Sequence, residues 1–256
     1  MWKLASAVIL SKGLSPSRSN PVSKGYPNHD PLERDCQVPD NGFFMEPAQI
    51  AELLHPFAAG ITLSPQLLGQ LQLYLDLLLQ WNARINLTAV RDPEQIVTRH
   101  FGESLFAAQV LLDGQGSGAK DLTVADVGSG AGFPGIPMKL YAPELTLTLI
   151  ESQNKKATFL REVIRRLELD RTEVFCGRAE QWGKTADFVT LRAVGQFKRA
   201  LPVAADLVAP SRQVCLLIGA GQAPTAREIL GEDWTWQRPV LVPLSAERVV
   251  LVGSRS

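Results

Sequence analysis

The sequence predicts an α/β fold built on a mostly parallel sheet, with a small helical unit before it. After residue 120, short apolar runs typical of β-strands alternate with stretches of helical spacing, which is the pattern of parallel strands joined by crossover helices. A segment holding four glycines follows the first of these runs. The last two runs are joined by Ser245–Glu247, which is too short for a crossover. We therefore expect that last pair to be antiparallel.

The expected strands cover residues 122–127, 145–151, 172–176, 187–193 and 213–219, followed by the pair 234–244 and 248–254. Helices fill the stretches between the first five. A mostly parallel sheet that ends in an antiparallel pair is a variation on the doubly wound fold. The sheet domain is expected to span residues 120–256.

Apolar residues at helical spacing predict a helical N-terminal unit over residues 46–113. Its second helix begins where Ser64 precedes Pro65, and its third where Asp92 precedes Pro93, because a capping side chain followed by proline suits a first turn. The third helix would bury the face formed by Ile96, Val97, Phe101, Leu105 and Ala108. Residues 114–120 are expected to join the two parts.

Residues 1–45 are rich in Ser, Pro, Asn and Gly, and we expect them to form a disordered extension. A short apolar patch, Leu4–Leu10, follows Lys3 and is the one feature in common with targeting peptides. Because it is short and has no clean cleavage site, we favour an extension without a targeting function.

Composition restricts the classes of function. The 26 basic residues balance the 26 acidic ones, so a polyanionic partner has to be bound by a local basic patch. Cys36, Cys176 and Cys215 are far apart and have no metal-ligand spacing, which opposes a disulfide framework or a metal site and favours the cytoplasm. No apolar run approaches the roughly 20 residues of a membrane helix.

The four-glycine segment, VADVGSGAGFPGIP at residues 124–137, predicts a ligand site. It would lie at the carboxyl edge of the sheet, where open α/β sheets bind ligands. A helix is expected to begin near Phe133, and its N-terminus would offer unpaired N–H groups to a polar ligand atom. Glu151, at the tip of the second strand, would accept hydrogen bonds from ribose hydroxyls. A nucleoside-containing cofactor is the expected ligand.

Two cofactors fit this segment. Residues 130–135, GAGFPG, satisfy the dinucleotide fingerprint, so an NAD-dependent oxidoreductase is one alternative. The spacing from Asp126 to Gly132, D-x-G-x-G-x-G, resembles the first motif of class I methyltransferases that use S-adenosylmethionine, and these enzymes also end in an antiparallel strand pair. Pro134 removes a donor that a pyrophosphate would use. We therefore favour S-adenosylmethionine.

Longer segments resemble one family. They are WNARINLTAVRDPEQIVTRHFGESL (81–105), the glycine segment, Glu151 with Lys155–Lys156 downstream, GRAEQ (177–181) and LRAV (191–194). Together, over residues 46–256, they resemble the bacterial small-subunit ribosomal RNA guanine-N7 methyltransferase family, also called the glucose-inhibited division protein B family. The resemblance implies a Rossmann-like class I methyltransferase domain and transfer of a methyl group from S-adenosylmethionine to N7 of one guanosine in 16S rRNA.

The chain departs from the family pattern at two places. The family usually has H-F-L-D-S-L where this chain has HFGESL at residues 100–105, and it often has a lysine where this chain has Ile218. Neither departure touches the glycine segment.

The resemblance also implies which residues bind the two substrates. Cofactor binding falls to Asp126, Gly128, Gly130, Gly132, Phe133, Glu151, Ala179, Glu180 and Arg192. The basic patch for RNA would consist of Arg84, Arg91, Arg99, His100, Lys155, Lys156, Lys198 and Arg199, although His100 could equally be a core histidine. No metal and no general base are expected, because a neutral ring nitrogen attacks the methyl group and orientation supplies the catalysis.

Other chemistries fit less well. Amino-group methyltransferases carry an Asp/Asn-Pro-Pro-aromatic motif where this chain has Leu191–Val194, and cytosine-C5 enzymes need a nucleophilic cysteine, whereas Cys176 and Cys215 lie in apolar runs. A catalytically inactive RNA-binding assembly factor is a further alternative, which the intact glycines oppose.

The expected partner is 16S rRNA in a small ribosomal subunit or an assembly intermediate. Guanine N7 faces the deep, narrow major groove of A-form RNA, so the base has to be splayed out. Near-zero net charge makes naked RNA a poor ligand. We expect a monomeric enzyme that does not bind membranes.

Overall fold

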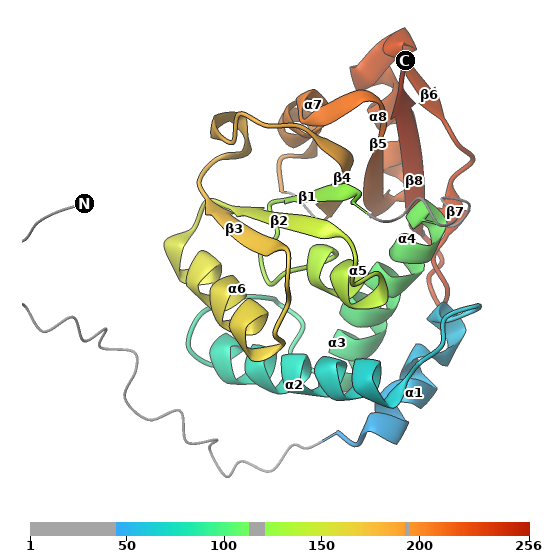
Figure 1. Cartoon of the computed structure of the whole chain (residues 1–256). Helices are drawn as coiled ribbons and strands as arrows, with labels where there is room; N and C mark the ends of the chain where they lie inside the picture. Colours follow the sequence, from blue (N-terminus) through green and yellow to red (C-terminus); the bar gives the residue numbers. More distant parts are fainter. Residues whose placement is uncertain (1–44, 113–120, 193–194) are drawn as a thin grey trace, which may run out of the picture. The chain divides into compact units, whose positions relative to one another are not determined.

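An eight-stranded mixed sheet forms the centre of the computed structural model of the chain (Figure 1). The strand order is β3-β2-β1-β4-β5-β8-β6, and β7 also pairs with β8. Strands β1 to β5 are parallel, and β8 runs antiparallel to β5, β6 and β7. The predicted α/β class and the terminal antiparallel strands are confirmed.

The structure describes residues 45–112, 121–192 and 195–256. These residues belong to one compact unit, Phe43–Ser256. The expected extension over residues 1–45, apart from Met45, and the expected joint over 114–120 lie outside the described residues, so the domain boundaries stay predictions. Within the described ranges, no helix has both the length and the apolar character needed to cross a membrane.

The boundaries of the first four strands follow the apolar pattern closely, whereas the single strand expected over residues 234–244 is divided into β6 and β7. The strands are β1 (Thr123–Val127), β2 (Thr146–Glu151), β3 (Thr172–Cys176), β4 (Ala186–Arg192), β5 (Val208–Gly219), β6 (Trp234–Trp236), β7 (Val240–Leu241) and β8 (Arg248–Arg255). β5 begins earlier than expected, at Val208 instead of Gln213. Its pairing with β4 is irregular there, and the residues between are partly exposed. The apolar pattern therefore does not mark them.

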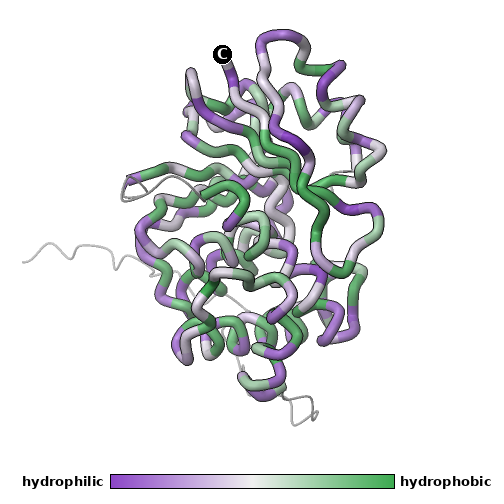
Figure 2. The backbone as a smooth tube through the Cα atoms, turned by 90° about the vertical axis from the view of Figure 1, so that its right-hand side faces the viewer, coloured by the Kyte–Doolittle hydropathy of each residue, from purple (hydrophilic) through white to green (hydrophobic). Residues whose placement is uncertain are grey.

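Helices cover both faces of the sheet, and each face has its own hydrophobic core. One face carries α2 (Pro65–Asn82), α4 (Glu103–Leu112), α5 (Gly135–Tyr141) and α6 (Asn154–Arg166), and the other carries α7 (Phe197–Asp206) and α8 (Ala223–Leu230). Successive strand residues alternate between the cores, as Leu216 and Leu217 do. Figure 2 shows the hydrophobic residues gathered along the central strands.

The N-terminal helices share the first core with the sheet, because α1 (Pro47–Leu54), the 3₁₀ turn η1 (His55–Phe57) and α2 contribute side chains to it. Ser64 Oγ accepts a hydrogen bond from Leu67 N–H at 3.2 Å, and Asp92 Oδ1 accepts one from Gln95 N–H at 2.8 Å. Both predicted helix starts are thereby confirmed. The remaining short turns are η4 (Ala179–Gln181), η5 (Ala220–Gln222) and η6 (Gly231–Asp233).

The third predicted helix is interrupted by a π-helical turn. It consists of α3 (Pro93–Ile96), the π turn η2 (Val97–Gly102) and α4. The expected buried face is confirmed, since Ile96, Val97, Phe101, Leu105 and Ala108 are all buried. Helical spacing alone does not reveal the extra residue that a π turn inserts.

Gly102, where the family usually has leucine, is required by the packing of η1 against the π turn. A Cβ atom at Gly102 would lie 2.6 Å from Cδ2 of Phe57, whose ring is buried. The Phe57 ring therefore fills the space that a larger side chain at position 102 would need.

Gly102→Ala should destabilise the protein by about 1–3 kcal/mol, since the added methyl group overpacks a closed site. The matched control is Gly69→Ala in α2, where a Cβ would meet no atom within 4 Å; it should raise the free energy of unfolding by about 0.5–1 kcal/mol. Urea denaturation of both variants checks this. Stabilisation by both substitutions would show that Phe57 does not restrict position 102.

Candidate functional site

The glycine loop, residues 128–135, lies at the carboxyl end of β1, at the point where the strand order changes direction. β1 pairs with β2 on one side and with β4 on the other. The chain runs from β1 through α5 to β2, and later returns to β4 on the opposite side. Open α/β sheets bind ligands at such a switch point.

Most backbone N–H groups of the loop already have acceptors inside the protein. Gly128 and Ser129 donate to the carbonyl of Ile150 at 2.9 and 3.1 Å, which ties the loop to the end of β2. The N–H groups with a protein acceptor are those of Gly128, Ser129, Gly130, Gly132, Phe133, Gly135 and Ile136.

The N–H groups in the first turn of α5 also have acceptors inside the protein. α5 begins at Gly135, and the N–H of this residue donates to the Asp126 carboxylate at 3.2 Å. The N–H groups of Ile136 and Met138 donate to the carbonyls of Gly132 and Pro134. The helix begins within two residues of Phe133, as expected. The expectation that its first turn offers unpaired N–H groups to a ligand is wrong. Without free donors, this turn does not form a phosphate cradle.

Two of the four glycines are required by the packing of the protein itself. A Cβ at Gly132, which has φ +95°, would lie 2.5 Å from the Tyr74 hydroxyl, and one at Gly135 would lie 2.7 Å from Leu149. The Tyr74 hydroxyl also donates a hydrogen bond to the carbonyl of Ala131. The loop is therefore pressed between α2 and β2, and Gly128 and Gly130 are the glycines that border open space.

Asp126 stabilises the glycine loop through hydrogen bonds within the core. It is completely buried and lines neither of the two cavities described below. Its Oδ1 accepts a hydrogen bond from Thr190 Oγ1 at 2.7 Å, and its Oδ2 accepts from Gly135 N–H. Burial raises the pKa of Asp126 to about 6, although these hydrogen bonds act in the opposite direction. The expected contribution of Asp126 to cofactor binding would therefore be indirect.

Glu151, at the end of β2, also stabilises the glycine loop through hydrogen bonds. It is 5% exposed; its Oε2 accepts from Gly130 N–H at 3.0 Å, and its Oε1 accepts from Gln153 N–H at 2.7 Å. Each carboxylate oxygen can accept a second hydrogen bond. Glu151 could therefore bind a ribose hydroxyl while it also positions the loop and the start of α6.

Two cavities meet at the glycine loop, and Gly128 lines both. The β2–β3 cavity, about 640 Å³, is bordered by Ile150, Ser152, Ala179, Glu180, Gln196 and Arg199, among others. The helix-side cavity, about 630 Å³, is bordered by Thr88, His100, Glu103, Phe133, Arg192 and Arg248, among others. An elongated ligand that crosses Gly128 would reach from one cavity into the other.

The structure brings most of the predicted site residues to these cavities. Ala179 and Glu180 line the β2–β3 cavity, Phe133 and Arg192 line the helix-side cavity, and Gly130 borders the latter. Gly132, within the loop, and Glu151, at the end of β2, are buried, and neither lines a cavity. Of the residues predicted to bind RNA, Arg99, His100 and Lys156 line the helix-side cavity and Arg199 the other, whereas Arg84, Arg91, Lys155 and Lys198 are exposed outside both.

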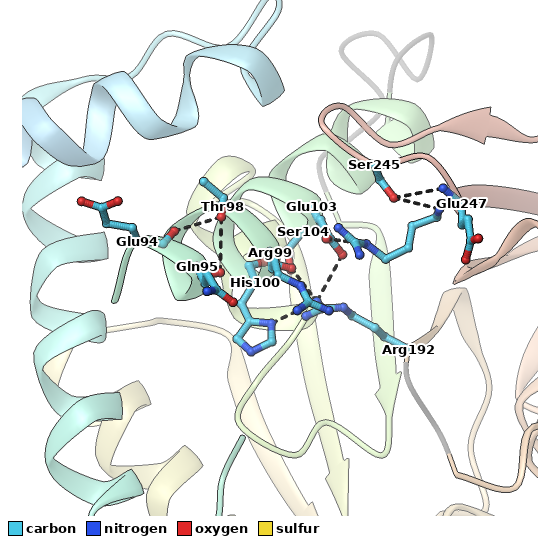
Figure 3. A network of polar contacts seen from close by, with 11 residues as sticks. Glu94, Gln95, Thr98, Arg99, His100, Glu103, Ser104, Arg192, Ser245 and Glu247 are labelled. Carbon is cyan, nitrogen blue, oxygen red and sulfur yellow. Dashed lines mark hydrogen bonds and ion pairs between the residues drawn. The ribbon is translucent and has the colours of Figure 1, made fainter. Parts of the chain in front are cut away.

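Arg192, at the end of β4, connects the sheet to the N-terminal helices (Figure 3). Its Nη2 donates to the carbonyl of Arg99 and to Nδ1 of His100, and it lies 3.3 Å from Glu103 Oε2. Glu103 Oε1 lies 2.7 Å from Nε of Arg248 on β8. The Glu103 side chain is 4% exposed, so an ion pair bridging three elements is built into the cavity wall.

His100 is fixed in the same wall as a neutral ring. Arg192 can only donate, so Nδ1 accepts, and the proton resides on Nε2, which lies 2.8 Å from Thr88 Oγ1. Burial, followed by the charges of Arg192 and Arg99, lowers the pKa of His100 to about 3. One face of the imidazole stacks on Phe133, with 4.8 Å between ring centroids. His100 therefore has side-chain partners at both ring nitrogens and lines the helix-side cavity.

Sequence reasoning missed Glu103, Arg248 and Thr88 as residues of the site. Glu103 lies three residues after His100, on the same side of a helical turn, which is a signal that could have identified it. Thr88 lies in the segment 81–105 used for the family resemblance, but no spacing rule singles it out. Arg248 stands at the start of β8, and its position depends on the strand order.

Within the parts of the chain that the structure describes, no group of three or more His, Cys, Asp or Glu residues could hold a metal ion. Cys215 is buried in β5, and burial raises its pKa to about 12. Its thiol is therefore a poor nucleophile.

Comparison with known proteins identifies relatives over most of the chain. A family model described as "GidB: rRNA small subunit methyltransferase G" matches residues 67–239. The "Ribosomal RNA small subunit methyltransferase G" of Bacillus subtilis (strain 168) is 37% identical over 177 residues, 67% of this chain and 70% of that protein. The protein of the same name from Stenotrophomonas maltophilia (strain K279a) is 37% identical over 201 residues, 78% of this chain and 90% of that protein.

Solved structures share the fold at low sequence identity. The magnesium protoporphyrin IX methyltransferase of Synechocystis PCC 6803, solved with bound SAM, has a TM-score of 0.56 and 14% identity, covering 83% of this chain and 98% of that chain. The N-methyltransferase NodS of Bradyrhizobium japonicum WM9, solved with S-adenosyl-L-homocysteine, has a TM-score of 0.51 and 16% identity, covering 69% and 97%. These likenesses confirm the predicted class I methyltransferase fold.

Glu103→Gln should cost about 3 kcal/mol of stability, because it leaves two arginines of the cavity wall without their buried partner, although Arg248 is partly exposed. The control is Glu162→Gln on α6, whose partners Arg165 and Arg166 are exposed; its cost should stay below about 1 kcal/mol. Guanidinium denaturation measures both. Equal losses of unfolding free energy in the two variants would mean that the buried Glu103 ion pair stabilises the protein no more than an exposed one.

The lowered pKa of His100 predicts a specific pH dependence of stability. Below pH 6.5 the unfolded chain protonates this residue, whereas the folded chain does not until about pH 3. The free energy of unfolding should therefore fall on acidification, by up to about 1.4 kcal/mol per pH unit. In His100→Phe this contribution disappears, while the opposite contribution of Asp126 is common to both proteins. Denaturation at pH 4 to 8 gives the difference; parallel curves would contradict a neutral His100.

Proposed function

The chain belongs to the rRNA small subunit methyltransferase G family, and from this premise we propose that it methylates N7 of one guanosine in 16S rRNA. The chain is an S-adenosylmethionine-dependent rRNA methyltransferase. The position of the modified atom rests on the family resemblance. The observation that carries the proposal is the glycine loop, at which two cavities of similar volume meet.

The residues around the loop suit S-adenosylmethionine. This cofactor supplies an electrophilic methyl group on a sulfonium. Glu151 would hold the ribose with its free lone pairs, and Ala179 and Glu180 would border the adenine in the β2–β3 cavity. Gly128, Gly130, Phe133 and Arg192 would border the methionine portion. Asp126 and Gly132 would contribute to cofactor binding indirectly, because they determine the conformation of the loop.

The closed start of α5 supports this cofactor over a nicotinamide dinucleotide. A dinucleotide binds with its pyrophosphate at a free helix N-terminus after the glycine turn. Here the Gly135 N–H is bound to Asp126, and the residue before it is Pro134. The oxidoreductase alternative therefore lacks its phosphate site.

The walls of the helix-side cavity suit a reaction that needs no proton transfer. Guanine N7 attacks with a neutral lone pair, so the protein has to orient the reactants and exclude water. Both nitrogens of His100 are engaged by Arg192 and Thr88, and Glu103 is ion-paired. No side chain among these is free to act as a general base. This argues for catalysis by positioning.

Four basic residues, Arg99, Lys156, Arg192 and Arg248, line the helix-side cavity. Such a cluster could bind the phosphates beside the target nucleoside even though the chain has no net charge. Arg84, Arg91, Lys155, Lys198 and Arg199 would extend the RNA surface. The substrate would be a small ribosomal subunit or an assembly intermediate that presents a splayed base, and the enzyme would act as a cytoplasmic monomer.

Incubation with unmethylated small ribosomal subunits and S-adenosylmethionine should produce N7-methylguanine at one position. Chemical cleavage at N7-methylguanine, followed by primer extension, locates it. Methyl incorporation at another atom would contradict the proposed target, and no incorporation would favour an inactive assembly factor. In calorimetry, S-adenosylhomocysteine should bind and NAD should not.

The same calorimetry tests Glu151. Glu151→Gln should weaken S-adenosylhomocysteine binding by about tenfold or more, because a hydrogen bond to a charged carboxylate is lost. The control is Glu173→Gln on the neighbouring strand β3, where the carboxylate is exposed and makes no hydrogen bond to the glycine loop. Equal affinities of the two variants would remove Glu151 from the cofactor site.

A further inference from the structure

We propose that the free face of the His100 ring is the surface on which the target guanine stacks during methyl transfer. The proposal rests on the function proposed above and assigns the base to a specific place in the helix-side cavity. It gives His100 the role of an aromatic platform, with no part in proton transfer.

The position of His100 is the first argument. The residue lines the helix-side cavity together with Gly128, which also lines the β2–β3 cavity. A base lying against His100 is therefore in the same cavity as the point where the cofactor site begins. Arg99, Lys156 and Arg248 line this cavity too, so the phosphates of a splayed nucleotide would have cations nearby.

The contacts of the ring leave one flat surface. Nδ1 lies 3.0 Å from Arg192 Nη2, and Nε2 lies 2.8 Å from Thr88 Oγ1, so both polar atoms are engaged in the plane of the ring. Phe133 covers one face, with an interplanar angle of 27°. Because His100 lines the helix-side cavity, we assign its other face and its carbon edges to that cavity. Aromatic faces of this kind stack on bases in many proteins that bind splayed nucleotides.

The ring is backed by an aromatic column that keeps it in place. Phe133 packs on Tyr74 and Phe101, at centroid distances of 5.4 and 5.6 Å, and Arg192 lies over the Phe133 ring at 5.8 Å. Tyr74 and Phe101 are completely buried. A platform that is rigid before the base arrives loses little conformational entropy on binding.

The charge of the ring also suits the product. Methylation at N7 gives guanine a positive charge, which a protonated imidazole would repel and a neutral aromatic face attracts. Burial, followed by the charges of Arg192, Arg99 and Arg248, lowers the pKa of His100 to about 3. The platform therefore stays neutral at physiological pH.

Two substitutions separate the ring from its nitrogens. His100→Phe keeps an aromatic face and removes the polar atoms, whereas His100→Gln keeps a polar group toward Arg192 and removes the ring. With unmethylated small ribosomal subunits and saturating S-adenosylmethionine, kcat/KM of His100→Gln should fall about 5- to 100-fold, the range expected for a lost base stack. His100→Phe should recover most of this loss, to within about threefold of wild type.

The other outcomes overturn the proposal. If His100→Phe is as impaired as His100→Gln, or if His100→Gln is the better enzyme, an aromatic face at this position does not support methyl transfer. If neither variant is impaired, the base binds elsewhere. Calorimetry with S-adenosylhomocysteine on both variants identifies a damaged cofactor site. Failure of the wild-type enzyme to form N7-methylguanine would remove the proposed function itself, whereas a wild-type enzyme that is active beside an inactive His100→Phe removes only the platform.

Discussion

Two buried carboxylates shape the glycine loop, and the site depends on them. Asp126 binds the start of α5 and the hydroxyl of Thr190, and Glu151 binds Gly130 and the start of α6. A buried carboxylate is costly unless it is hydrogen-bonded, and burial accordingly raises the pKa of Asp126. These bonds give the loop a fixed path before any ligand arrives. Of the four glycines, Gly128 and Gly130 are the two that line a cavity.

The N-terminal helices are part of the site as much as part of the core. Tyr74 of α2 presses on the glycine loop, and the π turn brings Arg99 and His100 to the end of β4. Glu103 then ties this turn to β4 and β8 through two arginines. Since removing one partner of a buried ion pair is far more costly than the pair is stabilising, this network favours a single arrangement of the cavity wall. A rigid wall is what catalysis by orientation requires.

The sequence predicted the features that rest on local patterns. The boundaries of the first four strands and the caps at Ser64 and Asp92 follow from alternation and from the hydrogen bonds of a first turn, both of which are set by neighbouring residues. The position of the glycine loop followed in the same way. The reason for the glycines did not, because the atoms that exclude side chains at positions 132 and 135 belong to Tyr74, Ile136, Leu149 and Asp126, most of which are distant in sequence.

Features that depend on long-range pairing could not be predicted. The closed N-terminus of α5 results from Asp126, nine residues earlier, and no propensity reveals that bond. Arg248 reaches the site only because β8 lies between β5 and β6, an order that the short connection before β8 does not specify. The π turn depends on contacts with η1 such as that of Phe57 with Gly102. A single sequence shows such pairs as unrelated residues.

The central claim is that the glycine loop binds S-adenosylmethionine while its own N–H groups stay bound to protein acceptors. The adenosine of the cofactor would lie on one side of Gly128 and the target guanine on the other. A crystal structure of the chain with S-adenosylhomocysteine tests it most directly. The account predicts adenosine in the β2–β3 cavity between Ser152 and Ala179, the sulfur beside Gly128, and the bonds of Asp126 and Glu151 to the loop intact. A ligand bound elsewhere, or a loop that breaks those bonds to donate its N–H groups to the ligand, would contradict it.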